Sequence, residues 1–194
     1  MANTDVTRGF VPVMHISGAP WNGQTMKMYK AAGTTVTDDL MPGDMVVTAA
    51  TADADGIIGI ARATAGDTQP SCGVIVSCEP LAAHLDRTWI DGADAGYVNV
   101  CTDPYVVFEG QADDVIAAAS VGTNANMVQT AVGSRTTGAS GQEVDATVNT
   151  TYTYQLKIIG IVRRPDNTIN SANNKVLVLI NNHQFKGATG TAGI

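Results

Sequence analysis

The amino-acid sequence predicts a mainly β protein: an antiparallel β-sandwich or a small barrel, with long loops, an extended N-terminal arm and at most one or two short helices. Composition favours this class, because only 15% of the 194 residues are charged and 5% are aromatic, while Gly, Ala, Thr and Val abound. Such a balance is typical of strands and tight turns rather than long, charge-rich helices. Roughly seven to nine short apolar or alternating segments follow one another at irregular spacing, which indicates a mostly antiparallel sandwich or barrel.

Residues 1–20 are expected to form the extended arm, followed by a single β-rich domain over residues 21–194. The segment Val6–Val13 alternates loosely between apolar and polar side chains. Gly9 and Pro12 disfavour an interior strand, since proline lacks the N–H that a central strand must donate. An edge strand, or an extended segment laid on a partner, fits this part of the chain better.

The strands of the domain are expected where side chains alternate or where apolar β-formers run together. The Pro42-Gly43 pair marks a turn that needs a positive φ at the glycine, and a strand follows it. Glycines inside several later segments indicate bends or bulges of the kind that small barrels require. The expected strands cover residues 26–30, 45–47, 57–62, 72–78, 97–101, 106–111, 155–162 and 176–180.

One helix is expected, over Asp113–Ser120. Its aspartates suit a helix N-terminus, its alanines propagate a helix well, and Gly122 ends it after roughly two turns. Residues 134–151 form a long polar loop of Gly, Ser and Thr without periodicity. A loop of this length within a compact domain is usually functional or mobile.

Charge is spread unevenly along the chain. The net charge is −7: residues 1–150 hold six Lys/Arg against seventeen Asp/Glu, which makes −11, and residues 151–194 hold five against one, which makes +4. Because a net-acidic protein neutralises phosphates poorly, direct binding to nucleic acid is not expected. The cationic part has two interpretations: it lies beside acidic loops of the same fold, or it matches a neighbouring subunit.

The sequence further predicts a soluble protein made in a cytoplasm, outside any membrane. Its first residues lack the basic start and apolar core of a signal peptide, and no apolar run approaches the ~20 residues that span a bilayer. Cys72 and Cys78 lie six residues apart in an expected strand, where extended geometry separates them by about 20 Å, too far for a disulfide. Together with Cys101, they are expected to be unpaired thiols, as a reducing compartment favours.

Motifs for catalysis or cofactor binding are not found: there is no nucleophile elbow, phosphate-binding loop, zinc-protease motif or dinucleotide fingerprint. His15, His84 and His183 are scattered, without a second ligand at metal-like spacing. His183 is interpreted as a hydrogen-bonded strand terminus, because no activated nucleophile is recognisable beside it. The carboxylate clusters are interpreted as solvated turns; they are Asp38/Asp39/Asp44, Asp53/Asp55, Asp91/Asp94 and Asp113/Asp114. No catalytic, metal-binding or cofactor-binding residue is therefore expected.

Several short motifs follow one another over nearly the whole chain. They are Gly9-Phe10-x-Pro12-Val13, Asp103-Pro104-Tyr105-Val106-Val107-Phe108-Glu109, a Ser/Gly/Thr loop ending Glu143-Val144-Asp145, Leu156–Ile161, Arg164-Pro165-Asp166-Asn167 and Ile180-Asn181-Asn182-His183-Gln184. In this order they resemble the head decoration (cement) proteins of tailed bacteriophages.

The resemblance implies a non-enzymatic virion protein that binds the outside of an icosahedral capsid where capsomers meet and stabilises the shell. Its partners would be the major capsid protein and further copies of itself, in a homotrimer by preference or a homodimer. It would be made in the cytoplasm of the host bacterium and end on the capsid exterior. The expected contact elements are Arg8–Val13 of the arm, the loop 134–151 and the Arg163-Arg164 turn; the candidate residues are Arg8, Phe10, Pro12, Arg163 and Arg164.

Two other readings stay open. Another virion part, such as a head-fibre base or a tail-tube component, would also be rich in β-structure. A small carbohydrate-active enzyme belongs to a different class, and it would need polar groups that converge in a pocket. The sequence singles out no such group.

Overall fold

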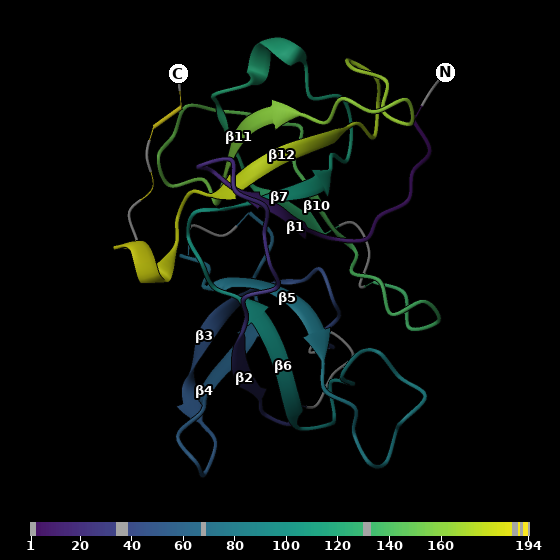
Figure 1. Ribbon diagram of the computed structural model, residues 1–194, viewed down its shortest axis with the longest axis vertical. Coiled ribbons are helices and arrows are strands. Elements are labelled where there is room, and N and C mark those ends of the chain that lie inside the picture. Colours follow the sequence, from purple (N-terminus) through teal and green to yellow (C-terminus); the bar gives the residue numbers. More distant parts are fainter. Residues whose placement is uncertain are drawn as a thin grey trace.

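Two groups of strands, a sheet and a barrel, lie one above the other along the long axis of the protein (Figure 1). They are seen in a computed structural model, which describes residues 3–33, 39–66, 69–129, 133–187, 190, 192 and 193. Helical structure in these residues is confined to two 3-10 turns, η2 (Ala118–Ser120) and η3 (Gln184–Lys186). The prediction of a mainly β protein with at most one or two short helices is confirmed.

The barrel has five strands and closes on itself in the order β2-β4-β3-β5-β6. The strands are β2 (Met26–Lys30), β3 (Met45–Ala52), β4 (Ile58–Arg62), β5 (Gly73–Cys78) and β6 (Gly96–Cys101). Neighbours are antiparallel, except that β2 and β4 run parallel. Closure removes the free edges that an open sheet would expose. A small core fills the interior, made of Met28, Leu40, Val46, Ile60, Cys72, Ile75, Ile90, Val98 and Val100.

The sheet has the order β1-β7-β12-β11-β8 and is antiparallel throughout. Its strands are β1 (Val11–His15), β7 (Val106–Gln111), β12 (Lys175–Ile180), β11 (Leu156–Ile161) and β8 (Asn124–Ala125). A ribbon of β9 (Met127–Gln129) and β10 (Gln142–Val144) adds Met127 and Val144 to the core of the sheet. Every residue of β7 is buried, and this strand lies between β1 and β12 in the sheet.

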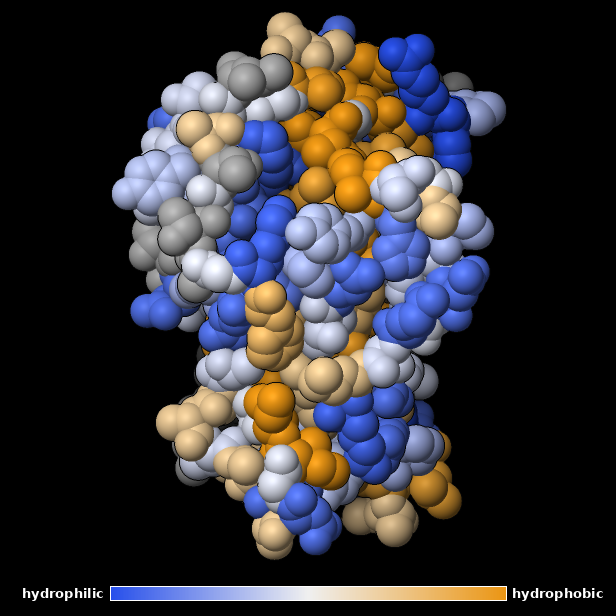
Figure 2. All heavy atoms as spheres, turned by 60° about the vertical axis from the view of Figure 1, so that its left-hand side comes forward, coloured by the Kyte–Doolittle hydropathy of each residue, from blue (hydrophilic) through white to orange (hydrophobic). Residues whose placement is uncertain are grey.

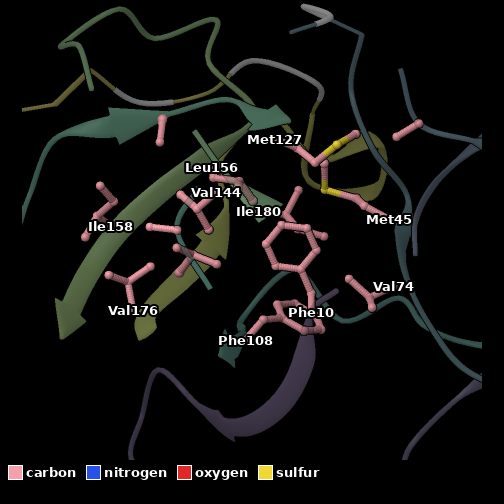
Figure 3. Close-up of a cluster of buried hydrophobic side chains, with 14 of the residues drawn as sticks. Phe10, Met45, Val74, Phe108, Met127, Val144, Leu156, Ile158, Val176 and Ile180 are labelled. Atoms are coloured by element: carbon pink, nitrogen blue, oxygen red, sulfur yellow. The ribbon is translucent and has the colours of Figure 1, made fainter. Parts of the chain in front are cut away.

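One hydrophobic core joins the sheet to the barrel. Phe10, Phe108 and Ile158 pack in the same cluster as Met45 and Val74, which come from barrel strands (Figure 3). Because a sheet must bury its apolar face against another element, this shared core makes each group of strands the cover of the other.

The chain before β1 crosses the turn before β3 at close range. Gly9 and Gly43 have φ values of +71° and +94°, and the Phe10 N–H donates to the Gly43 carbonyl oxygen at 2.9 Å. A Cβ on Gly43 would lie 2.3 Å from the carbonyl oxygen of Arg8. The positive φ predicted for the Pro42-Gly43 turn is confirmed. This crossing places the Phe10 side chain, which is 2% exposed, in the shared core.

The part of the predicted arm that is described, residues 3–20, lies on the chain's own sheet. β1 is the outermost strand and pairs with β7. Its other edge is covered, because Trp21 N–H donates to the Val13 carbonyl oxygen at 3.4 Å and His15 N–H donates to the Ala19 carbonyl oxygen at 2.8 Å. β1 is therefore an edge strand whose edge is largely occupied. The first two residues of the predicted arm lie outside the described residues.

The segment after β12 ties the sheet to the barrel a second time. Ser71 N–H donates to the Asn182 carbonyl oxygen, and Gln184 N–H donates to the Ser71 carbonyl oxygen, both at 2.9 Å. The Gln184 side chain bonds the backbone N–H and the hydroxyl of Thr48 on β3. His183 is 1% exposed, and its Nδ1 accepts the Phe185 N–H at 3.1 Å. The interpretation of His183 as a hydrogen-bonded terminus is confirmed.

The predicted helix over Asp113–Ser120 is wrong, since only η2 at its end is helical. Both backbone polar groups of Ile116 bond the side-chain amide of Asn174, at 3.1 and 2.8 Å. The Asp113 carboxylate accepts the Ala146 N–H at 2.8 Å. Side chains from distant segments thus take the place of the i to i+4 bonds that a helix would need.

The predicted mobile or partner-binding loop over residues 134–151 is wrong for residues 140–144, which are all buried and include β10. The Ser140 hydroxyl donates to Asp44 Oδ1 at 2.6 Å, and Met45 N–H donates to Gln142 Oε1 at 2.6 Å. The hydroxyl and amide groups of this part of the loop satisfy buried groups of the barrel.

The carboxylates of Asp39 and Asp44 are also buried, which corrects their prediction as solvated turns; Asp38 lies outside the described residues. Asp39 forms a two-pronged ion pair with the Arg135 guanidinium at 2.8 and 2.9 Å. Asp44 accepts the Met41 N–H at 2.8 Å besides the Ser140 hydroxyl. Burial raises the Asp44 pKa to about 6.

We expect Gly43→Ala to lower the free energy of unfolding by more than about 2 kcal/mol, because it adds a steric clash to the strain of a positive φ. Gly56→Ala is the matched control: Gly56 also has a positive φ, +80°, but a Cβ there meets nothing within 4 Å. It should cost about 1–2 kcal/mol, the backbone strain alone. Urea unfolding of both variants measures the difference, and equal losses would contradict the close crossing.

Burial shifts two pKa values in opposite directions, raising that of Asp44 from 3.8 to about 6 and lowering that of His183 from 6.5 to about 4. The Asp44 contribution to stability is present below pH 4 and lost as pH rises through 6. The His183 contribution is present above pH 6.5 and lost as pH falls through 4. Each is on the order of 3 kcal/mol, so the two offset each other in the wild type.

Asp44→Asn should therefore remove the Asp44 contribution and leave the opposite pH dependence of His183 without its counterpart. Relative to wild type, the variant should gain stability as pH rises from 4 to 6, by an amount on the order of 3 kcal/mol. Urea unfolding at several pH values in this interval measures the difference between the two proteins. A difference that does not change with pH would show that Asp44 titrates normally.

Candidate partner-binding surface

A buried carboxylate on the outer face of the sheet holds two arginines. Glu109 is on β7, opposite Val11 of β1 and Leu177 of β12, and is 5% exposed. Its Oε1 accepts from Arg8 Nη2 at 2.9 Å and from Arg164 Nη2 at 2.8 Å, and its Oε2 accepts from Arg164 Nη1 at 2.9 Å. Both guanidinium groups keep about half of their surface in solvent, with side chains 52% and 43% exposed. They therefore form an exposed layer over a buried negative charge.

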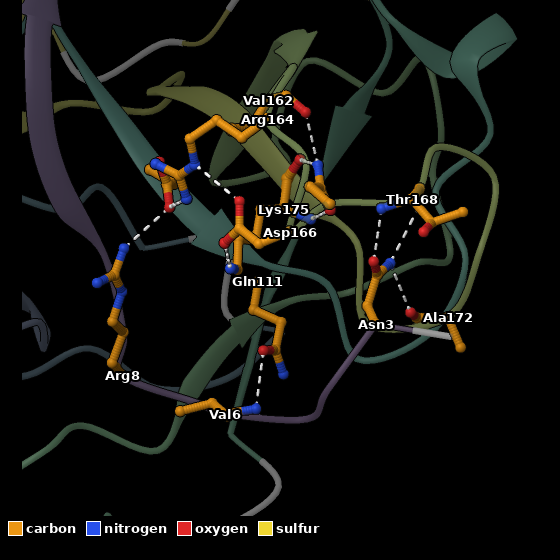
Figure 4. Close-up of polar contacts among 12 residues, drawn as sticks. Asn3, Val6, Arg8, Gln111, Val162, Arg164, Asp166, Thr168, Ala172 and Lys175 are labelled. Atoms are coloured by element: carbon orange, nitrogen blue, oxygen red, sulfur yellow. Dashed lines mark hydrogen bonds and ion pairs between the residues drawn. The ribbon is translucent and has the colours of Figure 1, made fainter. Parts of the chain in front are cut away.

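The ion pairs continue from Arg164 toward the turn between β11 and β12. Arg164 Nε lies 3.2 Å from Asp166, and Lys175 Nζ donates to the other oxygen of Asp166 at 2.6 Å (Figure 4). Arg8, Arg164 and Lys175 thus share two carboxylates, which leaves one positive charge in excess. Arg163 is exposed and has no ion pair within the described part of the chain, so it adds another. The guanidinium groups of Arg8, Arg163 and Arg164 are exposed here on a protein of net charge −7, and the carboxylates of Asp5 and Glu143 accept from the Gln111 amide on the same face at 2.8 and 3.1 Å.

Hydrogen bonds fix the chain that carries Arg8. The Asn3 side chain bonds the backbone of Thr168 in both directions and donates to the Ala172 carbonyl oxygen at 3.0 Å. Val6 N–H donates to the Gln111 Oε1 at 3.0 Å (Figure 4). With its backbone held by the 168–172 turn and by β7, the segment presents Arg8 at a defined position.

A groove begins beside Arg8 and runs between β1 and the barrel. Its volume is about 190 Å³, and its walls are mostly apolar. Two prolines, an indole ring and valines supply this lining, so the groove offers rigid side chains that lose little entropy on contact. The lining residues are Arg8, Phe10, Val11, Pro12, Trp21, Pro42, Gly43, Ile75 and Val76.

A strip of apolar side chains continues over the outer face of β11 and β12. Ile159, Leu177 and Leu179 are partly exposed and belong to neither hydrophobic core. Leu179 is paired with Lys157, and Leu177 with Gly160, so these side chains share the outer face of the sheet. In Figure 2, hydrophobic residues gather in the upper half of the molecule, where the sheet lies, and strongly hydrophilic residues flank them. We name Ile159, Leu177 and Leu179 the outer strip.

The structure brings together several of the residues predicted to contact a partner. Arg8 and Arg164 meet on Glu109, and Arg163 is exposed beside Arg164. Pro12 is partly buried and lines the groove. Phe10 is a correction: it was predicted as a contact residue, but its ring is buried in the shared core and closes the inner wall of the groove.

Sequence reasoning missed the groups that organise this surface. Glu109 had a usable signal, since Val107, Glu109 and Gln111 share one face of a strand whose neighbours are apolar. Nothing in the sequence indicates that Trp21 would line a groove. The partner of each arginine was not predictable at all, because Arg8 and Glu109 are 101 residues apart and Arg164 and Glu109 are 55 apart.

The three cysteines and Asp53 have structural surroundings in the described residues. Burial raises the pKa of Cys72 and Cys78 to about 12 and of Cys101 to about 11, so these unpaired thiols are weak nucleophiles. Asp53 closes a turn by accepting the N–H groups of Asp55 and Ile57. The described residues hold no group of three His, Cys, Asp or Glu side chains that could bind a metal ion.

Comparison of the chain with protein-family models, with curated proteins and with solved structures gave no match. Within the described residues, no helix has the length and apolar character to cross a membrane. The interpretation of the surface therefore depends on its own geometry and on the sequence motifs.

Glu109→Gln should lower the free energy of unfolding by about 1–3 kcal/mol, because it leaves two guanidinium groups without their shared carboxylate. Glu79→Gln is the matched control. It breaks an exposed pair, in which Lys27 and Glu79 are 2.8 Å apart with side chains 45% and 36% exposed, and should cost less than about 1 kcal/mol. Urea unfolding compares the two variants; a loss at Glu109 no larger than at Glu79 would contradict a structural role for the cluster.

Proposed function

We propose that this chain is a non-enzymatic structural protein of a bacteriophage virion, which decorates the outer surface of an icosahedral capsid. It binds the major capsid protein where capsomers meet and stabilises the shell. It acts there as a homo-oligomer, a trimer by preference, and it contacts neither nucleic acid nor membrane. Its place is the capsid exterior, after synthesis in the host cytoplasm. Two observations support the proposal: the motifs that resemble those of head decoration proteins, and a surface that can bind a partner.

The observation that carries the proposal is the pairing of the cationic cluster with the apolar groove on one rigid frame. The arginines on Glu109 leave excess positive charge beside a groove walled by Pro12, Trp21 and Pro42. Charge of this kind guides a partner of opposite sign and sets its orientation, while apolar contact in a preformed groove holds it. An acidic, apolar surface of a capsomer fits this combination.

The rigidity of the frame suits a clamp. The N-terminal segment, the turn before β3 and the segment after β12 are all held by backbone hydrogen bonds to distant parts of the chain. A protein that bridges neighbouring capsomers must resist their relative movement, and each bridge gains from acting at several sites at once. Deleting the arm would not test this, because residues 10–13 contribute Phe10 and β1 to the fold. Single substitutions are the appropriate probe.

We expect the purified protein to bind particles of the encoding phage that lack it, and Arg8→Ala to weaken that binding by about tenfold. Arg8→Ala leaves Glu109 paired with Arg164, so the fold is preserved. The dependence of affinity on salt should become flatter, because one charge has left the interface. Co-sedimentation of labelled protein with particles at several salt concentrations gives both quantities.

Lys27→Ala is the control, since Lys27 is an exposed cation on β2 of the barrel, away from the groove. It should bind particles like wild type. An electron cryo-microscopy reconstruction should show the protein on the outer shell. Its absence from the shell, or its presence in a tail tube or fibre, would overturn the proposal.

A further inference from the structure

The loop between β5 and β6 carries an exposed apolar tip. Leu85 is 75% exposed, the highest value among the large hydrophobic side chains of the described residues. Its neighbour Asp86 is exposed too and has no ion pair within the described residues. Residues 79–94 hold four carboxylates and one arginine, a net charge of −3. The tip therefore presents one exposed apolar side chain on an acidic loop.

The loop is held in position for contact. Backbone bonds join Leu81 to His84 and His84 to Arg87. Trp89 lies between the guanidinium groups of Arg87 and Arg135, about 5 Å from each. Because these contacts fix the base of the loop, its tip loses little freedom when it meets another surface.

The outer strip has the opposite character. Ile159, Leu177 and Leu179 are apolar and partly exposed, and the turn with Arg163 and Arg164 lies at one end of β11. Within the described residues, neither Arg163 nor Asp86 forms an ion pair. The loop tip and the outer strip are thus complementary in two ways. Both offer apolar side chains, and the carboxylate of Asp86 is opposite in charge to the guanidinium of Arg163.

The chain segments that carry the two surfaces also differ in charge. Residues 21–101, which include the barrel, contain four Lys/Arg and ten Asp/Glu, a net charge of −6. Residues 151–194, which include β11 and β12 of the sheet, have a net charge of +4. Barrel and sheet lie at opposite ends of the long axis (Figure 1), so the acidic segment and the cationic segment are separated along the protein, while residues 102–150 of the sheet half carry a net charge of −5.

We propose that the occupant of the outer strip is a second copy of this chain, whose loop tip places Leu85 on the strip and Asp86 against Arg163. The two surfaces are different, so the contact is head-to-tail, and such contacts close into rings when the rotation between copies allows it. The inference deepens the proposed function, on which it rests for the expectation of an oligomer. It needs no capsid to be tested.

Charge exchange tests the contact in solution. Asp86→Arg and Arg163→Glu should each weaken self-association by about tenfold or more, since each places like charges in contact. The doubly exchanged chain D86R/R163E should associate like wild type, because every copy then carries a matched pair. An equimolar mixture of the two single variants should regain association, because a D86R chain and an R163E chain match at both surfaces and the two kinds of chain can alternate. Sedimentation velocity at low and high salt measures all four samples.

Asp55→Arg and Lys27→Glu are matched controls for charge, at an exposed turn and on β2 of the barrel, and should not change association. Leu85→Ser should weaken association, whereas Ile58→Ser, at a 39% exposed residue of β4, should not. A monomeric wild type, or a doubly exchanged chain that stays as weak as the single variants, would overturn the inference. Association that survives without capsid binding would count against the proposed function alone.

Discussion

The fold depends on how closely the N-terminal segment passes the turn before β3. Gly9 and Gly43 meet there without side chains, and the following residue, Phe10, enters the core between the sheet and the barrel. If the two segments were held apart by the width of a Cβ, the Phe10 ring would be withdrawn from Phe108 and Gly110, on which it packs. Because packing in a protein interior is dense, such a shift would leave a void in the shared core between the sheet and the barrel. The two glycines are therefore a condition for the shared core.

Polar side chains, besides the shared hydrophobic core, connect parts of this protein that are distant in sequence. Gln142 joins the ribbon to β3, Asn174 holds the segment before η2, and Gln184 joins the last segment to Thr48. Buried amides that are hydrogen-bonded to distant segments add specificity to the core. This explains why segments that look like solvated loops in the sequence are buried in the fold.

The sequence predicted those features that depend on neighbouring residues. Strands such as β2 and β7 follow from alternation or β-branched runs, and the Pro42-Gly43 turn follows from the conformations open to each residue. It did not predict features that depend on distant partners. Asp113–Ser120 has helical propensity, yet Asn174 and Ala146 bind its backbone and carboxylate instead. Tertiary contacts override propensity in such cases.

The candidate surface likewise combines features set by neighbouring residues with features set by distant partners. Arg8, Pro12 and Arg164 could be proposed from motifs, but the carboxylate that unites the two arginines lies on the most buried strand. A lone buried carboxylate would be costly, and a pair of solvated arginines would be mobile. When the three side chains are joined, the carboxylate fixes both guanidinium groups, and these keep about half of their surface in water. A charged surface that is fixed in this way distinguishes between partners by geometry as well as by sign, which a flexible cluster of lysines could not do.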